Sequence, residues 1–167
     1  MSDNESLGTI RRLDGQYEAR LERVLEHDQA RVWAMLTEPA HLADWLAPGT
    51  IELRMGGAAR LNFVDSGTVI DSVVTAIDPP RLIEYSWSGP GEPLRPVRWE
   101  TEPVGGGTLL SLTMRMPDDE DVARNCAGWE AHLLMLIAAI EGVPIKFPFQ
   151  RFQETRAAYR DRLAGGA

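Results

Sequence analysis

The sequence predicts an α+β fold, in which an antiparallel sheet of about six to seven strands is covered on its inner face by a long C-terminal helix. Bulky apolar residues alternate with charged residues through residues 51–117, as expected for an antiparallel sheet with one face in water. Residues 125–142 then form a largely apolar helical segment that ends at a glycine. Two short helical segments between residues 28 and 48 follow the first strand.

The N-terminal part of the chain supplies that first strand. Residues 1–15 are polar and contain glycine, and we expect them to be a loosely ordered lead-in to a single domain over residues 16–167. The length of 167 residues is close to the commonest size of one domain. Residues 16–27 alternate between apolar and charged side chains and predict a strand, although Arg23 and Val24 break the pattern.

Two short helices are expected next. Asp28 can cap the first of them and Thr37 the second. Pro39 lies at the opening of the second helix, a position that proline favours. Pro48 and Gly49 then end the helical region.

About six further strands follow, separated by turns that contain glycine or proline. We expect them at residues 51–55, 58–64, 68–77, 81–88, 95–103 and 108–116. The glycines at 105–107 make the last hairpin turn, since a phosphate-binding loop would need a following helix and a GK[ST] ending. Arg98, Glu100 and Glu102 lie on the alternate face to Trp99 and predict a solvated ladder of cross-strand charges.

The C-terminal part of the chain is expected to be helical. The acidic run at residues 118–121 suits a helix N-terminus, and it lacks the glycine and the terminal glutamate of a calcium-binding loop. The long helix that follows is apolar all round between Leu133 and Ile140, so we expect it to be buried on most sides. Residues 149–163 predict a final amphipathic helix that packs against the long helix or along the sheet edge.

Composition restricts the partners and the compartment. The 17 basic and 25 acidic residues give a net charge of −8, which argues against nucleic acid as a partner. Cys126 is the single cysteine, so no intramolecular disulfide can form and a cytoplasmic location is expected. The longest apolar run, at residues 133–140, is far shorter than the roughly 20 residues that span a bilayer, and we expect no membrane insertion.

Five segments carry a resemblance to a known family, namely ARVWAMLTEPAHLADWL, DPPRLIEYSW, RWETEPVGGGTLLSL, GWEAHLLMLIAAIEG and FQETRAAYRDRL. In order and spacing they resemble homologues of the activator of the heat-shock-protein-90 ATPase. That family belongs to the START-like or SRPBCC superfamily, whose helix-grip fold is shared with the birch-pollen allergen. The resemblance covers residues 17–163.

The resemblance implies a sheet curved around the long helix, with a cavity between the sheet, that helix and the two short helices. Members of the superfamily bind lipids, hormones or other hydrophobic small molecules, and some are polyketide cyclases or aromatases. This chain departs from the family at residues 110–114, which read LSLTM where relatives commonly read roughly L-T-L-T-H. Loss of that histidine makes the inner wall more apolar and weakens a catalytic interpretation.

The expected cavity lining combines inward-facing strand residues with one side of the long helix. Its members are Trp45, Leu61, Phe63, Ile83, Tyr85, Trp87, Val97, Trp99, Leu112, Met114, Trp129, His132, Met135 and Leu136. The methionines would let the wall adapt to a ligand of irregular shape. On this basis, Trp129→Ala or Trp99→Ala should weaken ligand binding.

Trp129 and His132 lie three residues apart where the apolar part of the long helix begins. In a structural interpretation Trp129 fills the core and His132 forms a hydrogen bond with a neighbour, as buried polar groups usually do. In a functional interpretation His132 orients the polar end of a ligand and Trp129 is the apolar wall beside it. The sequence leaves both open.

Signatures of common catalytic and metal sites are missing. The sequence has no C-x-x-C, H-E-x-x-H or G-x-S-x-G motif. His27, His41 and His132 fall on different expected elements without metal-ligand spacing, so we expect neither a metal nor another cofactor. Cys126 is expected to be a small buried residue rather than a nucleophile.

Three classes of function stay open. The leading one is binding or carriage of a small hydrophobic molecule, lipid-like or aromatic, in the internal cavity. The second is a cyclase-like enzyme in which Tyr85 and His132 transfer protons, although so apolar an inner face favours binding over catalysis. The third, by analogy to the family alone, is a protein-interaction role with a chaperone ATPase as the partner. An exposed sheet edge also leaves a homodimer open.

Overall fold

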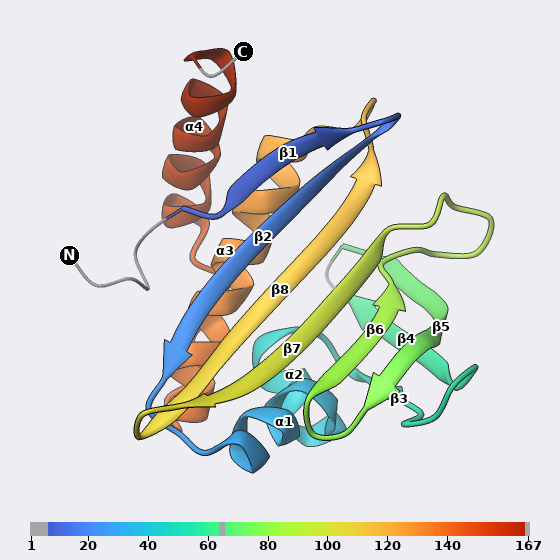
Figure 1. Cartoon of the computed structure of the whole chain (residues 1–167), viewed down its shortest axis with the longest axis vertical. Coiled ribbons are helices and arrows are strands. Elements are labelled where there is room, and N and C mark those ends of the chain that lie inside the picture. The colour runs from blue at the N-terminus through green and yellow to red at the C-terminus, as the bar shows by residue number, and fades with distance from the viewer. Residues whose placement is uncertain (1–6, 64–65, 166–167) are drawn as a thin grey trace.

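A computed structural model describes residues 7–63 and 66–165 of the chain. Its strands form one antiparallel sheet of eight members in the order β1-β2-β8-β7-β6-β5-β4-β3 (Figure 1). The strands are β1 (Thr9–Leu13), β2 (Gln16–Leu25), β3 (Gly49–Ile51), β4 (Ala58–Phe63), β5 (Thr68–Asp78), β6 (Leu82–Ser86), β7 (Pro96–Val104) and β8 (Gly107–Pro117). The helices are α1 (Gln29–Thr37), α2 (Pro39–Trp45), α3 (Val122–Ile140) and α4 (Phe149–Gly165).

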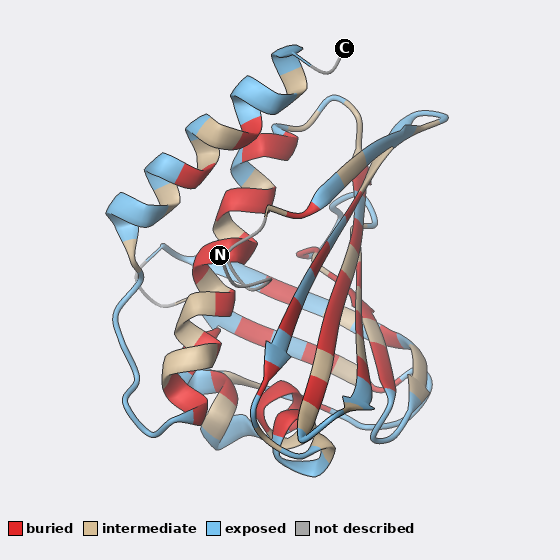
Figure 2. Cartoon of the chain, turned by 60° about the vertical axis from the view of Figure 1, so that its left-hand side comes forward, coloured by how far each residue is buried: buried red, intermediate tan, exposed pale blue. Residues whose placement is uncertain are grey.

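The layers agree with the predicted fold class. The long helix α3 runs behind the sheet, α1 and α2 lie at one end of it, and α4 packs on the side of α3 (Figure 1). Buried residues follow the sheet face that looks toward α3 and the facing side of α3 itself (Figure 2). The core therefore lies between sheet and helix, and this is the helix-grip arrangement that the resemblance implied.

The eighth strand is the one that the sequence analysis missed. Residues 9–13 form β1 instead of belonging to a loosely ordered lead-in, and they pair with β2 from Thr9 opposite Arg20 to Leu13 opposite Gln16. The sequence did contain a signal, because Asp14-Gly15 is a favoured two-residue hairpin turn. In the structure Gly15 has a φ of 74°, which glycine adopts readily. Residues 1–6 of the expected lead-in lie outside the described residues.

The strand expected at 51–55 is also different. It ends at Ile51, because the residues from Glu52 to Gly57 form the turn into β4. The side chain of Glu52 accepts a hydrogen bond from the Ala58 backbone N–H at 2.8 Å, which closes that turn. Extended pairing resumes in β4, where Ala59 lies opposite Ile51.

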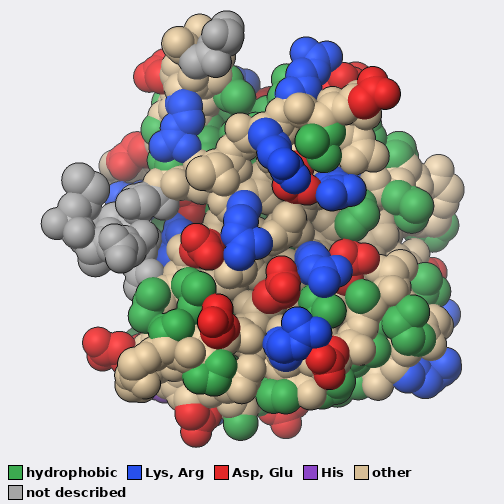
Figure 3. All heavy atoms as spheres, viewed as in Figure 1, with side chains coloured by type: hydrophobic (Ala, Val, Ile, Leu, Met, Phe, Trp, Pro, Cys, Tyr) green, Lys and Arg blue, Asp and Glu red, His purple; other side chains and the backbone are tan. Residues whose placement is uncertain are grey.

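Charged side chains cover the outer face of the sheet. Basic and acidic groups are interspersed over the strands in the space-filling view (Figure 3). Arg98 forms ion pairs with Glu84 at 3.3 Å and with Glu100 at 3.6 Å, so the predicted charge ladder includes Arg98 and Glu100. Its groups are partly exposed, and such pairs add little to stability.

Helix α1 begins where the sequence analysis expects it, but the cap of α2 is different. The Asp28 side chain accepts a hydrogen bond from the Arg31 backbone N–H at 2.8 Å. Thr37 does not cap α2: it is the last residue of α1, and its hydroxyl donates to the Trp33 carbonyl oxygen at 2.8 Å. Glu38 takes the N-cap position without a side-chain bond, and Pro39 opens α2 as expected.

Helices α3 and α4 confirm the C-terminal predictions. Asp121 caps α3 by accepting a hydrogen bond from the Arg124 backbone N–H at 3.1 Å. Gly142, with a φ of 83°, follows the C-terminus of α3 in the left-handed conformation that glycine adopts readily. Helix α4 takes the first of the two expected positions, against α3. No helix in the described part of the chain is long and apolar enough to span a bilayer.

A charged network crosses the core between β2, α3 and α4. Arg23, which breaks the alternation of the first predicted strand, faces inward and pairs with Glu130 of α3. Both side chains are nearly inaccessible, at 6% and 7% exposure. The Tyr159 hydroxyl donates to Glu130 at 2.9 Å and accepts from the Gly8 backbone N–H at 2.7 Å. The network therefore ties α4 and the start of β1 to the sheet.

Candidate functional site

The predicted lining residues separate into a buried and a half-buried group. Ten of the fourteen are at most 7% exposed and belong to the hydrophobic core: Trp45, Leu61, Ile83, Tyr85, Val97, Trp99, Leu112, Met114, Trp129 and Leu136. The other four are half-buried: Phe63, Trp87, His132 and Met135. These four are the part of the predicted site that solvent, and hence a ligand, can reach.

Aromatic rings connect the buried and the half-buried residues. We call the set Trp45, Phe63, Trp87, Trp99, Trp129, His132 and Phe147 the aromatic cluster. Its innermost contact joins Trp45 and Trp99, whose ring centroids are 5.6 Å apart in a T-shaped arrangement. Trp129 lies 5.6 Å from Trp99 on its inner side and 4.7 Å from the half-buried Trp87 on its outer side. Edge-to-face contacts of this kind add to the free energy of area burial and fix the ring positions.

His132 lies in the outer part of the aromatic cluster. Its ring centroid is 5.9 Å from Phe63, 6.0 Å from Trp129 and 5.5 Å from Phe147. Its Nδ1 atom lies 2.9 Å from the backbone carbonyl oxygen of Trp45. A carbonyl oxygen only accepts hydrogen bonds, so Nδ1 carries the proton and, in the neutral ring, Nε2 is an acceptor.

The environment also keeps that ring neutral. Burial among apolar groups lowers the pKa of His132 below its usual 6.5, and the bond to the Trp45 carbonyl opposes this only in part. No described residue donates a hydrogen bond to Nε2. The structural interpretation of His132 is thus correct for Nδ1, which forms a hydrogen bond with a neighbour. Nε2 is an acceptor that no described residue uses, and it lies among aromatic rings.

Phe147 is the member that the sequence analysis missed. It lies in the segment between α3 and α4, is 39% exposed, and packs against both His132 and Phe152 of α4. The available signal was the run VPIKFPF at residues 143–149, which places apolar residues in a connection where polar ones are usual. Residues of that run are well exposed, with Val143 at 63% and Phe149 at 61%.

The inner end of the cluster contains two polar groups. The indole N–H of Trp99, which is 0% exposed, makes no hydrogen bond of regular geometry, and the hydroxyl oxygen of Tyr85 is an acceptor near it. Tyr85 lies beside it on the same sheet face, because Ile83 is opposite Trp99 and Tyr85 is opposite Val97. Burial raises the pKa of Tyr85, and the nearby Trp99 N–H counteracts part of that rise without reaching hydrogen-bond geometry.

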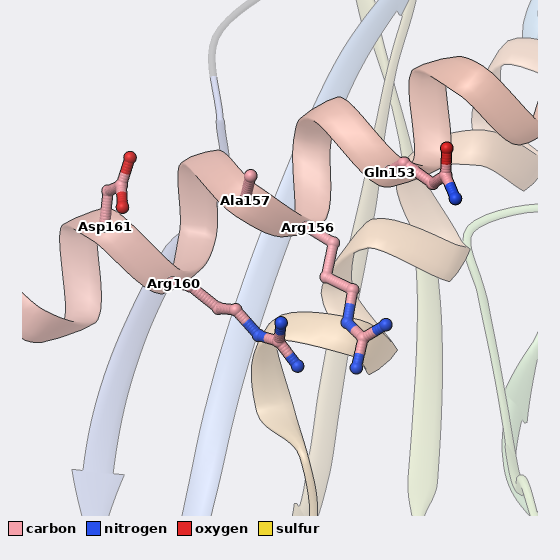
Figure 4. Close-up of a pocket in the computed structure, with 5 residues that line it drawn as sticks. All are labelled: Gln153, Arg156, Ala157, Arg160 and Asp161. Atoms are coloured by element: carbon pink, nitrogen blue, oxygen red, sulfur yellow. The ribbon is translucent and has the colours of Figure 1, made fainter.

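A pocket of about 330 Å³ is found elsewhere, on the surface of α4 (Figure 4). Its lining residues are Gln153, Arg156, Ala157, Arg160 and Asp161. Arg156 and Arg160 extend from the same side of the helix and both pair with Asp121, at 3.1 Å and 3.5 Å. Since the two guanidinium groups already share a carboxylate at the start of α3, this pocket is a polar surface feature and is separate from the predicted lining.

The described residues offer no metal site. Within residues 7–63 and 66–165, no group of three or more histidine, cysteine or acidic side chains could hold an ion. Asp121 instead caps α3, while Asp118 pairs with Arg12 and Glu120 with Arg95, each at 2.9 Å. Cys126 is 0% exposed, and burial raises its pKa to about 12, so it is not poised as a nucleophile.

Comparison with known proteins gives one family and a consistent fold. The family model described as "Activator of Hsp90 ATPase homolog 1-like protein" matches residues 26–141. A search of curated proteins finds no match to this sequence.

Solved structures are similar over nearly the whole chain. CalU16 from Micromonospora echinospora is 23% identical with a TM-score of 0.75, and the alignment covers 92% of this chain and 94% of that one. A protein from Bordetella parapertussis is 27% identical with a TM-score of 0.70, covering 97% and 95% of the two chains. DynU16, described as a protein in the dynemicin biosynthetic locus, is 26% identical with a TM-score of 0.69, covering 76% of this chain and 48% of that one.

Proposed function

The chain belongs to the Activator of Hsp90 ATPase homolog 1-like family, and from this premise we propose that it binds a small, flat aromatic molecule at the aromatic cluster around His132. The observation that carries the proposal is the state of His132. Its Nδ1–H is held by the Trp45 carbonyl, so the neutral ring presents a fixed acceptor at Nε2. An acceptor surrounded by aromatic rings suits a ligand that is apolar over most of its surface and bears one hydroxyl group.

The surroundings of Nε2 support an aromatic ligand over an aliphatic one. The ring of His132 packs against Phe63 in a T-shaped arrangement and against Trp129 in a tilted one, at centroid distances of 5.9 Å and 6.0 Å. A flat ligand gains offset or edge-to-face contacts with such rings in addition to the hydrophobic free energy. Half-buried Met135 adds an unbranched side chain that can adjust to the outline of a ligand.

A cyclase-like reaction is the second candidate, favoured by the same neutral histidine. Nε2 could take a proton from a ligand at neutral pH, as a general base must. Tyr85, the other predicted proton-transfer group, has a raised pKa and stays protonated, so it can donate a hydrogen bond but cannot act as a base. The description of DynU16 as a protein of a biosynthetic locus supports a small molecule as ligand or substrate.

The expected compartment and protein partners rest on the sequence alone. A cytoplasmic location is consistent with the single, buried cysteine. The homodimer and the chaperone partner stay predictions.

The test compares two probes that differ in one hydroxyl group. Calorimetric titration should give saturable binding of 2-naphthol and of naphthalene, with 2-naphthol bound about tenfold more tightly because of one added hydrogen bond. His132→Phe should abolish the difference and retain naphthalene binding. His41→Phe, which changes a half-buried histidine of α2 outside the cluster, is the matched control and should leave the difference intact.

Two results would contradict the proposal. Absence of binding for both probes removes the aromatic site altogether. An equal loss of 2-naphthol affinity in the two histidine variants would show that the hydroxyl group is not bound at His132. The cyclase-like candidate would require turnover of a polyketide-like substrate that is lost in His132→Phe.

A further inference from the structure

The connection between α3 and α4 exposes more large apolar side chains than any other segment of its length in the described chain. Of the ten exposed large hydrophobic residues in that part, four lie within residues 143–149, which we call the apolar connection. They are Val143 at 63%, Ile145 at 44%, Phe147 at 39% and Phe149 at 61%. Figure 2 shows this connection as exposed chain beside α3. Connections are normally polar, and clustered exposed apolar groups mark interaction surfaces.

Side-chain packing, rather than backbone hydrogen bonding, holds the middle of the apolar connection on the protein. The ring of Phe147 packs against His132 and Phe152, at centroid distances of 5.5 Å and 5.6 Å. The backbone N–H groups of residues 145–147 donate to no described residue. The two prolines that flank these residues have no N–H group. Three consecutive backbone donors are therefore open to a partner.

These open donors and the local charge favour a protein partner over a lipid surface. In hydrocarbon the N–H groups of residues 145–147 would have no acceptor, which is costly, whereas a protein partner offers carbonyl oxygens. Lys146 is the one charged residue of the apolar connection, and it forms no ion pair with a described residue. Attraction to an anionic membrane normally needs a cluster of basic residues, and this chain has a net charge of −8.

We propose that the partner is a second copy of this chain, and that residues 143–149 of each copy pack against those of the other about a twofold axis. In such a dimer each apolar connection meets an identical one, so apolar side chains cover apolar side chains. The carbonyl oxygens of one segment can accept from the open N–H groups of the other. The surplus of acidic side chains on the second copy offers Lys146 a carboxylate. This dimer needs no ligand, so it does not rest on the proposed function.

Sedimentation equilibrium over about 1–300 µM protein tests the dimer, since this range brackets the micromolar dissociation constant expected of a small interface. Wild-type protein should pass from the mass of one chain to that of two. Val143→Asp places a carboxylate in the apolar interface and should raise the dissociation constant at least about tenfold. Leu94→Asp is the matched control, because Leu94 is 75% exposed between β6 and β7, and it should leave the constant unchanged. Both positions are exposed, so circular dichroism should show both variants folded.

Hydrogen exchange of wild-type protein tests the backbone contacts without a variant. The N–H groups of residues 145–147 should exchange more slowly in concentrated protein than after dilution to single chains. Exchange that is equally fast at both concentrations overturns the proposal.

Three other results would also overturn it. The first is wild-type protein that stays a single chain over the whole concentration range. The second is a dimer that Val143→Asp leaves intact, which places the interface elsewhere. The third is single-chain protein that sediments with vesicles of phosphatidylcholine and phosphatidylglycerol when Val143→Asp does not, which assigns the apolar connection to a lipid surface.

Discussion

The Nδ1 atom of His132 and the backbone carbonyl oxygen of Trp45 lie 2.9 Å apart, which joins α3 to the last residue of α2. This contact does two things. It holds the second short helix against the long helix, and it selects the imidazole tautomer that leaves Nε2 as an acceptor. Structural support and ligand recognition therefore depend on the same side chain.

Stability should depend on pH through His132. Its pKa in the folded protein is lower than 6.5, mainly because of burial, so below about pH 6.5 the unfolded chain binds more protons at this site than the folded one. The contribution of neutral His132 is thus complete above that pH and decreases as the pH falls toward the folded-state pKa. In urea unfolding between about pH 7 and pH 5.5, wild-type protein should lose stability and His132→Phe should lose less. An identical slope in His132→Phe and wild type would contradict this, and His41→Phe serves as the control.

Removal of one partner of the buried Arg23–Glu130 pair should be strongly destabilising. Both side chains are less than a tenth exposed, so Arg23→Met would leave the Glu130 carboxylate in the core without its cation. We expect a loss of about 3–5 kcal/mol in the free energy of unfolding. Arg23→Met combined with Glu130→Leu should recover much of it, because an apolar pair of similar volume needs no desolvation of charge. A double variant as unstable as the sum of the single variants would show that the network has another role.

Arg23 also illustrates what the sequence could not predict. Strict alternation in the strands led to the correct sheet face for Tyr85, Trp99 and Leu112, since a period of two places such residues on one side. Arg23 follows the same period and faces inward, yet a single strand gives no sign that its partner is Glu130, 107 residues away. Long-range pairing of charges is a property of the tertiary structure, and local patterns do not encode it.

The candidate site was likewise predictable from the sequence only in part. The rings of Trp129 and His132 were correctly placed together by helical spacing, and their packing against strand residues followed from the fold. The hydrogen bond that fixes the proton on Nδ1 is accepted by a backbone carbonyl. Every residue has such a carbonyl, so side-chain patterns could not identify this partner. Phe147 was missed because a connection between helices has no period from which its direction could be read.

Tyr159→Phe should loosen α4 from the rest of the protein. The Tyr159 hydroxyl is buried, donates to Glu130 and accepts from the Gly8 backbone N–H. Its loss leaves a carboxylate and an amide with unmet hydrogen bonds, at a cost of about 1–3 kcal/mol in urea unfolding. Tyr17→Phe is the control, because Tyr17 is a half-buried residue of β2 whose hydroxyl has no such hydrogen bonds. This variant should change stability little. Unchanged stability in Tyr159→Phe would indicate that water replaces the hydroxyl.

Phe147→Ala should weaken aromatic ligands and leave the fold stable. Phe147 is 39% exposed, so its truncation removes little core volume, but its ring forms one wall beside His132 at 5.5 Å. We expect the affinity for 2-naphthol to fall about threefold to tenfold, the usual range for one aromatic contact. Phe149→Ala is the matched control, because Phe149 is 61% exposed and contacts Phe152 instead of His132. Equal effects of the two variants would place the ligand away from His132.

Labelling of Cys126 should report how α4 separates from α3. The thiol is fully buried, its pKa is raised to about 12, and it lies close enough to Glu130 and Tyr159 for their charges to affect one another. A disulfide reagent can therefore react only after an opening that brings the thiol into water and lets it ionise. If α4 detaches as a local unit, the free energy of opening from labelling rates will be smaller than the free energy of global unfolding. Tyr159→Phe should then accelerate labelling more than its effect on global stability requires, whereas Phe149→Ala should not. Equality of the two free energies in wild type would mean that α4 leaves only when the whole domain unfolds.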